Sequence, residues 1–306
     1  MSINNNETDN MNEFLLMDRL QKIRQIINKY GEENFYISFS GGKDSTVLSD
    51  LVDMALPGNK IPRVYANTGI ELNMIRDFVF DKAKEDDRVV IIKPSVPIKK
   101  MLETDGYPFK SKMHSVYVKK YQNKGLGYKS VRAYIGIENT LSGKPMYRRC
   151  PKILKYQFTE ENTLKISDMC CIRMKEEPIK KWSKENNKPY GVVGIMREEG
   201  GRRFDAQCLL FIGKKLKNFQ PLAPVTKDWE EWLISKYNID ICDIYKSPYN
   251  FQRTGCKGCP FALNLQEELD TLEKYFPNER KQCEIIWKPV YNEYRRIGYR
   301  LKPIQE

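Results

Sequence analysis

The sequence lacks several patterns that define common protein classes. Its 306 residues include a single histidine, His114, which excludes any mechanism that needs a histidine pair or a histidine-rich metal site. The sequence contains no run of about eighteen apolar residues, the length needed to cross a membrane. The polar residues 1–12 lack the apolar core of a signal peptide. No internal repeat or low-complexity segment is present. These absences predict a soluble, cytoplasmic protein without a membrane partner, in a compartment where disulfide bonds are rare.

The chain is strongly basic. It has 52 Lys and Arg residues against 40 Asp and Glu, a formal net charge of +12. This balance favours a polyanionic partner, either nucleic acid or a highly phosphorylated small molecule, although many of the cations will be solvated surface. A hydrophobic content of 41% is enough to bury a core in one large or two modest domains. The composition gives no indication of the oligomeric state.

The most informative segment is Ser40-Gly41-Gly42-Lys43-Asp44-Ser45, which lies between the β-rich run Phe35–Phe39 and the apolar-periodic run Thr46–Ala55. Adjacent glycines let the backbone turn sharply and bring its N–H groups against an anion, and the positive end of the following helix points to the same place. Lys43 adds a cation. Ser40 and Ser45 add hydroxyl donors, and Ser45 could cap the helix. The segment therefore predicts a phosphate-binding turn, and the alternative is an ordinary turn between a strand and a helix.

This turn is not a Walker A loop. Ile37 stands where that loop has its first glycine, and Asp44 stands where it has Ser or Thr directly after the lysine. The turn instead resembles the SGGKDS signature of the PP-loop ATP pyrophosphatases. That resemblance implies cleavage at the α-phosphate of an adenosine nucleotide with release of pyrophosphate, rather than transfer of the γ-phosphate.

The periodicity of the chain predicts an α/β fold. Strand and helix patterns alternate over the first hundred residues, which favours a twisted parallel sheet with helices on both faces. The expected strands are Phe35–Phe39, Arg63–Ala66, Val89–Ile92 and Gly191–Ile195, and the expected helices are Leu15–Ile27, 46–55, Glu71–Lys84, one capped by Thr226, and 264–275. We expect an N-terminal helix (1–30), a nucleotide-binding domain (31–215) with a substrate-side insertion (104–166), and a helical, Cys-rich C-terminal portion (216–306).

Ligands of parallel sheets bind at the carboxyl ends of the strands. That rule places the turn 40–45 and the segment Asn67–Gly69 at one edge, and a strand over 191–195 would deliver Met196 and Arg197 to the same edge. The stretch Gly106–Lys112 is interpreted as a substrate-side loop, with a plain surface turn as the alternative.

Four of the eight cysteines form two pairs, Cys170-Cys171 and Cys256-Lys257-Gly258-Cys259. Zinc sites usually space their paired cysteines by two to four residues, so adjacent thiolates chelate one zinc ion awkwardly. A four-iron cluster offers several iron atoms and can accept a CC pair and a CxxC pair together. The pairs thus favour a [4Fe–4S] cluster, and the alternatives are a structural zinc ion or unliganded, redox-active thiols.

Several segments resemble the phosphoadenosine phosphosulfate (PAPS) reductase family. The run 170–178 resembles its CCxxxKxxP motif, Asn67–Glu71 its NTGxE segment, and 193–203 its GIRxxES-type segment, in which Gly200 stands where the family has Ser. The resemblance extends from Phe35 to Phe261 and implies an adenine nucleotide alpha-hydrolase-like, Rossmann-like fold.

The resemblance also implies roles for individual residues. It assigns phosphate or sulfate to Gly41, Gly42, Lys43 and Ser45, and the adenosine to the strand ends near Ser38, Asn67, Thr68, Gly69 and Gly194. Lys175 would lie close to both the cluster and the nucleotide, where a cation offsets both negative charges; the alternative is a solvated helix lysine. Arg197, Arg202 and Arg203 can contact phosphate oxygens in bidentate fashion, although one or two of them could face solvent or pair with Glu198 and Glu199.

The chain departs from the sulfonucleotide reductases at its C-terminus. Those enzymes carry a nucleophilic cysteine in an ECGLH-like motif, which is missing here, and Cys283 lies in a helical pattern typical of a buried residue. The better fit is the branch that uses ATP directly, to which DNA phosphorothioation and tRNA thiolation sulfurtransferases belong. In that reading ATP binds with Mg²⁺, for which Asp44 is a possible ligand, sulfur comes from a donor protein such as a cysteine desulfurase, and the acceptor is nucleic acid or a small molecule. The alternatives are an adenylyl sulfate or PAPS reductase and a non-catalytic nucleotide-binding regulatory or defence component.

Three further expectations concern single residues. His114 is interpreted as exposed, with a catalytic base as the alternative. Arg148 and Arg149 could lower the pKa of Cys150 and make it a sulfur-carrying thiol, against the alternative of an ordinary loop cysteine. Cys208 and Cys242 lie in apolar stretches and are expected in the core.

Overall fold

The structure is a computed structural model that describes residues 5–199 and 203–303. The chain divides into two compact units, and each is built from separate stretches of sequence. The first, here called the sheet unit, comprises Met1–Asn67, Asn73–Lys93 and Pro178–Thr254. The second, here called the cysteine unit, comprises Thr68–Leu72, Pro94–Glu177 and Gly255–Glu306. Within the described residues, no helix is both long and apolar enough to cross a membrane.

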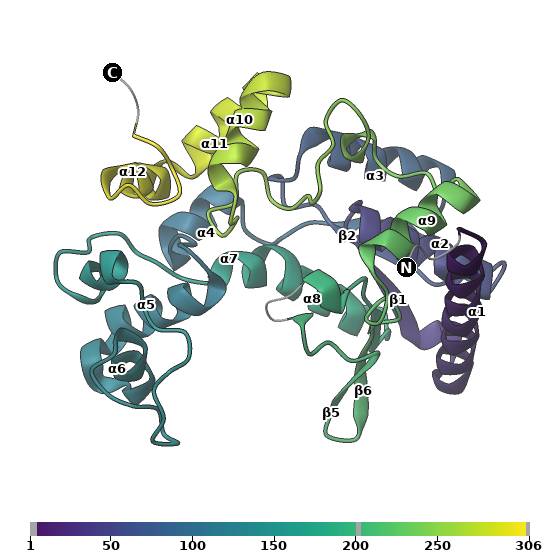
Figure 1. The fold of residues 1–306 in the computed structure, drawn as a ribbon, viewed down its shortest axis with the longest axis horizontal. Helices are drawn as coiled ribbons and strands as arrows, with labels where there is room; N and C mark the ends of the chain where they lie inside the picture. Colours follow the sequence, from purple (N-terminus) through teal and green to yellow (C-terminus); the bar gives the residue numbers. More distant parts are fainter. Residues whose placement is uncertain (1–4, 200–202, 304–306) are drawn as a thin grey trace. The chain divides into compact units, whose positions relative to one another are not determined.

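The sheet unit is built on six strands in the order β3-β2-β1-β4-β6-β5 (Figure 1). All neighbours are parallel except β5 and β6, which form an antiparallel pair at one end. The strands are β1 (Phe35–Phe39), β2 (Arg63–Ala66), β3 (Val89–Ile92), β4 (Tyr190–Val192), β5 (Leu209–Ile212) and β6 (Lys215–Phe219). The predicted α/β fold with a mostly parallel sheet is confirmed.

Helices pack on both faces of this sheet. On one face, apolar residues of α1, α2 and α9 form a core with Phe35 and Ile37 of β1, and Val79 of α3 packs against Phe39. Tyr36 points to the opposite face, because successive strand residues alternate, and its ring meets that of Trp182 on α8 at 5.9 Å. These helices are α1 (Asn5–Tyr30), α2 (Lys43–Ala55), α3 (Asn73–Glu85), α8 (Glu177–Glu185) and α9 (Lys227–Tyr237).

Local sequence signals explain most of these elements. Leu16, Leu20, Ile23 and Ile27 recur at helical spacing, and all four are buried in α1. Thr226 caps α9 as expected, since its hydroxyl accepts a hydrogen bond from the Trp229 amide at 3.2 Å. The fourth strand is shorter than predicted: β4 ends at Val192, and residues 193–195 leave the sheet. The hairpin of β5 and β6 was not predicted.

The cysteine unit is mainly helical. Its helices are α4 (Ile98–Asp105), α5 (Lys112–Lys124), α6 (Lys129–Ile135), α7 (Met169–Cys171), α10 (Leu265–Tyr275), α11 (Pro277–Ile286) and α12 (Lys288–Arg296). A π-helical turn, Ile172–Glu176, continues α7. Short 3-10 turns occur in both units, at Glu32–Asn34, Gly125–Gly127, Lys152–Phe158, Arg197–Glu199 and Asp243–Tyr245.

The expectation that His114 is exposed is wrong. Its side chain is fully buried on α5, where Nδ1 lies 2.9 Å from the Tyr134 hydroxyl and Nε2 lies 2.6 Å from Oε1 of Gln157. Burial lowers the pKa of His114 to about 4. The sequence could not reveal this, because Tyr134 and Gln157 lie far along the chain.

His114 predicts a pH dependence of stability. Because the folded-state pKa lies below the ordinary value of about 6.5, its stabilising contribution is present above pH 6.5 and is lost as the pH falls toward 4. We expect the free energy of unfolding to fall over that window by up to about 3 kcal/mol. Urea unfolding at a series of pH values should show a shallower slope for His114→Gln, and equal slopes would contradict the prediction.

The predictions for Cys150 and Cys208 also require correction, whereas that for Cys242 is confirmed. Cys150 is buried, and burial raises the pKa of its thiol to about 11, so Arg148 and Arg149 do not activate it. Cys242 is buried as expected, whereas Cys208 is half-buried at the margin of the sheet core.

Candidate phosphate loop and cysteine site

The turn between β1 and α2 requires its glycines. Gly41 has φ of 70°, and a Cβ atom there would lie 2.5 Å from Cγ2 of Val79 on α3. Gly42 precedes the first residue of α2 in an extended conformation. A Cβ on Gly42 would lie 3.1 Å from the Ser40 hydroxyl and 3.3 Å from that of Tyr245. The two glycines therefore let the turn pack tightly against α3 and against the hydroxyls of Ser40 and Tyr245.

Replacing Gly41 with alanine should disrupt the loop. The added methyl group meets Val79 and also strains a left-handed backbone conformation, so we expect a loss of about 1–3 kcal/mol in the free energy of unfolding. Chemical denaturation measures this loss, with Gly213→Ala, another positive-φ glycine but one with open space around it, as the matched control. A Gly41→Ala variant no less stable than Gly213→Ala would show that the contact with Val79 does not constrain the loop.

The two serines of the loop hold its shape. Ser45 Oγ donates to the Gly42 carbonyl at 2.9 Å and accepts from the Ser40 amide at 3.1 Å. The Ser40 hydroxyl accepts a hydrogen bond from the Gly42 amide at 3.2 Å. Ser45 does not cap α2, because the capping position is Gly42. That part of the prediction is wrong. Both serines instead form hydrogen bonds within the turn.

Lys43 points to a carboxylate that the sequence analysis missed. It forms an ion pair with Glu230 of α9, whose side chain is fully buried. Burial, with the charge of the neighbouring Asp44, raises the pKa of Glu230 to about 7, although Lys43 opposes the shift. An anionic ligand at the loop would therefore compete with Glu230 for the charge of Lys43.

Other groups of the sheet unit surround the same loop. A Cβ on Gly194 would lie 2.9 Å from the Asp44 carbonyl, so the chain leaving β4 passes directly over the loop. The hydroxyls of Tyr245 and Thr254 are hydrogen-bonded to each other beside Gly42. Ser38 lies within β1, next to Val64 of β2. The carboxyl ends of β1, β2 and β4 share one edge because these strands are parallel, and this edge carries the loop.

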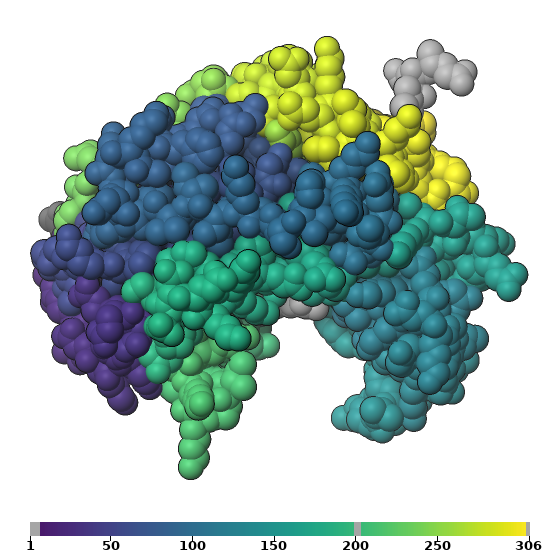
Figure 2. All heavy atoms as spheres, turned by 180° about the vertical axis from the view of Figure 1, so that it is seen from behind, coloured from purple at the N-terminus to yellow at the C-terminus, as the bar shows by residue number. Residues whose placement is uncertain are grey.

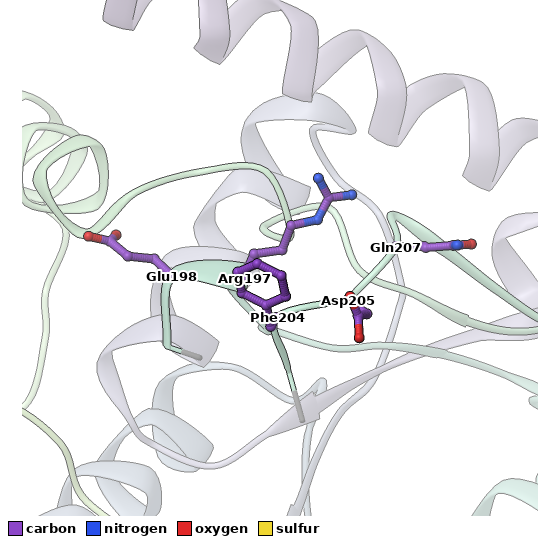
Figure 3. A pocket seen from close by; sticks show the side chains of 5 residues that line it. All are labelled: Arg197, Glu198, Phe204, Asp205 and Gln207. Carbon is purple, nitrogen blue, oxygen red and sulfur yellow. The ribbon is translucent and has the colours of Figure 1, made fainter. Parts of the chain in front are cut away.

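The predicted arginines lie after β4. Arg197 is exposed, and its Nε donates to the Ala206 carbonyl at 2.5 Å. Glu198 points away from it (Figure 3) and accepts a hydrogen bond from the Lys227 amide at 2.6 Å. Arg197, Glu198, Phe204, Asp205 and Gln207 line a hollow of about 650 Å³. Arg203 is half-buried, and Arg202 lies outside the described residues.

The segment after β2 crosses between the two units. The Asn67 amide donates to the Ile92 carbonyl at 2.9 Å and belongs to the sheet unit. Thr68 and Gly69 belong to the cysteine unit. There the Thr68 hydroxyl donates to Glu71 at 2.6 Å, and its amide donates to the same carboxylate at 3.1 Å. The structure thus assigns Thr68 a local partner, Glu71, that was not predicted as a site residue.

The two cysteine pairs come together in the cysteine unit. Burial raises the pKa of Cys170, and the thiols of the other three cysteines raise it further. Burial likewise raises the pKa of Cys256 to about 11, and also that of Cys259. Thiols perturb one another in this way only at short range. Across the described part of the chain, no three His, Cys, Asp or Glu side chains are arranged to hold a metal ion.

The turn that carries Cys256 and Cys259 is tightly held. Gly258 has φ of 57°, and a Cβ there would lie 2.8 Å from Sγ of Cys283. Its amide donates to Glu268 at 3.0 Å, and the Lys257 amide donates to the Ile70 carbonyl at 2.7 Å. The four free thiols match a [4Fe–4S] cluster in the number and kind of their donor atoms, although the described side chains are not arranged as a metal site.

Lys175 lies among these thiols rather than in open solvent. Its Nζ is 3.9 Å from Oε1 of Glu71. The thiolate of Cys256 and the carboxylate of Glu71 raise the pKa of Lys175. Lys175 is therefore protonated at neutral pH, and its charge is available to offset that of thiolates.

Cys283 is unsuited to nucleophilic attack. Its side chain is fully buried in α11, and burial raises the pKa of the thiol to about 12. A reactive cysteine needs a lowered pKa and access to substrate.

Comparison with known proteins gives likeness at the level of three-dimensional structure. No protein-family model matches the sequence, and the search of curated proteins found no match. A PAPS reductase from Candida auris is 14% identical and covers 84% of this chain and 97% of its own, with a TM-score of 0.45. A U34-tRNA thiolase from Methanococcus maripaludis, solved with its [4Fe-4S] cluster, is 16% identical and covers 94% of this chain and 80% of its own, with a TM-score of 0.40. The chain is similar in structure to a PAPS reductase and to a tRNA thiolase.

Proposed function

We propose that the protein binds ATP at the loop Ser40–Ser45 and cleaves it between the α- and β-phosphates, releasing pyrophosphate. The conformation of the loop Ser40–Ser45 is the main support for this proposal. Its glycines let the backbone turn sharply between β1 and α2, and Lys43 is the first residue of α2, whose positive end would face a bound phosphate.

We assign a separate role to each residue around the loop. On binding of ATP, Lys43 would break its ion pair with Glu230 and neutralise phosphate charge. Asp44 would hold Mg²⁺, directly or through water, and Mg²⁺ would neutralise the triphosphate and the leaving pyrophosphate. Gly194 lets the chain after β4 lie against the loop near Asp44. We assign the adenosine to Ser38, Asn67 and Gly194, with Thr68 and Gly69 next along the chain, and further phosphate contacts to Arg197, Arg202 and Arg203.

We propose that Cys170, Cys171, Cys256 and Cys259 hold a [4Fe–4S] cluster. The number of thiols and the mutual influence of their charges support this assignment, and Lys175 would balance the charge of the thiolates. A bound cluster would supply a site that holds or relays sulfur. A structural zinc ion at the same thiols is the alternative.

ATP cleavage would then support sulfur transfer. An oxygen of the acceptor attacks the α-phosphorus, the bond to the bridging oxygen breaks, and pyrophosphate leaves. A sulfur nucleophile from a donor protein then displaces AMP from the activated acceptor. The net charge of +12 suits a nucleic-acid acceptor. The buried Cys283 weighs against sulfonucleotide reduction by this chain's own C-terminal cysteine.

The product of the reaction tests the nucleotide assignment. Purified protein with Mg²⁺ and ATP should release pyrophosphate, measured with and without added RNA or DNA, and AMP should accompany it where water attacks in place of the acceptor. Orthophosphate as the first product would contradict cleavage between the α- and β-phosphates. If the protein bound ATP tightly but did not turn it over with any acceptor, it would instead be assigned as a nucleotide-binding regulatory or defence component.

A further inference from the structure

The hairpin Leu209–Phe219, here called the finger, projects from the sheet unit. Gly213 and Lys214 form its turn, with Gly213 at φ of 59°, and Ile212 pairs with Lys215 beside it. Figure 1 shows β5 and β6 extending beyond the other strands, and the same segment, light green, stands clear of the neighbouring atoms of its unit in Figure 2. The finger is therefore accessible to a partner.

The finger exposes apolar side chains that a sheet normally covers. Leu210, Phe211 and Ile212 are consecutive in β5, and their exposed fractions are 38%, 44% and 63%. The strand lies at the end of the sheet, so one of its sides has no neighbouring strand in the described part of the chain. Exposed apolar edge strands are a liability in water unless a partner uses them.

The positive charge of the finger indicates which kind of partner it binds. Lys214, Lys215 and Lys217 are all exposed. The sequence from Ala206 to Thr226 contains no Asp or Glu. A second copy of the same basic edge would be repelled, whereas a polyanion would be attracted.

We propose that the finger binds single-stranded nucleic acid. Phe211 and Ile212 offer apolar surface for unpaired bases, and the three lysines contact phosphates. The inference that the bound nucleic acid is the acceptor rests on the proposed function. Binding of nucleic acid by the finger does not itself require ATP cleavage.

The position of the finger in the sheet indicates a docking site rather than the reacting site. Strand β6 is parallel to β4, so its first residue, Lys215, lies toward the amino edge of the sheet, and Phe219 lies toward the edge that carries the loop. At about 3.3 Å per residue, Lys217 lies about 7 Å from that edge and Lys215 about 13 Å from it. A strand of several nucleotides can span this distance, and a small acceptor cannot.

Fluorescence anisotropy tests the proposal with fluorescein-labelled 30-nucleotide RNA and DNA single strands of the same sequence. We expect the triple variant Lys214→Glu, Lys215→Glu, Lys217→Glu to bind at least about tenfold more weakly, and the slope of log K against log salt to become shallower by about 2. Phe211→Ala with Ile212→Ala should weaken binding without changing the slope. The RNA and DNA arms show which nucleic acid is preferred.

The matched control is Lys180→Glu, Lys181→Glu, Lys184→Glu on α8 of the same unit, which makes the same charge change. Equal binding by the finger variant and this control would overturn the proposal. Binding of anionic phospholipid vesicles without binding of either strand would assign the finger to a membrane surface instead. Loss of self-association in the Phe211→Ala, Ile212→Ala variant, with nucleic-acid binding unchanged, would assign it to a second copy of the chain. Pyrophosphate release from ATP alone should be unchanged in every finger variant, so failure here is distinguishable from failure of the proposed function.

Discussion

Lys43→Ala should lower pyrophosphate release from ATP by about 10²–10³-fold, because on the proposed function Lys43 is the cation that stabilises the charge developing on the phosphates. The steady-state rate with Mg²⁺ and ATP measures this effect. Lys84→Ala is the matched control, since it removes the same charge from an exposed site on α3 of the same unit. An unchanged rate in Lys43→Ala would contradict the assignment of the loop.

The single variant has a second effect that must be separated from the first. Removing Lys43 leaves the buried Glu230 without its cation, which destabilises the fold. The double variant Lys43→Ala, Glu230→Gln should recover stability but not activity. Glu230→Gln alone should bind ATP at least as tightly as the wild type, because Lys43 no longer has to leave a carboxylate. If Glu230→Gln instead abolished binding, the carboxylate would contribute directly to the site.

Cys256→Ser should abolish iron binding in protein purified without oxygen. The wild type is expected to carry about four iron atoms and about four acid-labile sulfides per chain, with broad visible absorption. The variant should contain little of either, because Cys256 is one of the four proposed ligands and interacts with both Cys171 and Lys175. Iron and sulfide analysis gives the result independently of any enzyme assay.

Cys208→Ser serves as the control, since Cys208 belongs to the sheet unit and lies outside the thiol group. It should retain full iron content. A colourless wild-type protein without iron or acid-labile sulfide would contradict the cluster, and stoichiometric zinc that is lost in Cys256→Ser would assign the four thiols to a structural zinc ion. Pyrophosphate release from ATP would remain a separate question in either case.

Local patterns in the sequence were sufficient for much of the sheet unit. The strands Phe35–Phe39, Arg63–Ala66 and Val89–Ile92 have the predicted bounds, because each is a short apolar run between turn signals. The glycines of the loop were predicted for the same reason, since their conformation depends on adjacent residues and the start of α2. The CxxC turn is equally local.

The features that were missed depend on contacts far apart in the sequence. Glu230 faces Lys43 across nearly two hundred residues, and nothing in the pattern of α9 marks this glutamate as buried. His114 shows the same limit, because its burial depends on Tyr134 and Gln157. The finger was missed because its lysines interrupt the apolar alternation by which strands are recognised.

The strand order has a consequence for biosynthesis. The central strand β1 pairs on one side with β2, which follows it closely, and on the other side with β4, whose pairing joins Phe35 to Tyr190. A ribosome must therefore translate past residue 192 before that side of β1 is covered, and past α9 before Glu230 can reach Lys43. Until then a nascent chain exposes an apolar strand edge, so amino-terminal fragments that end before β4 should depend on chaperones to stay in solution.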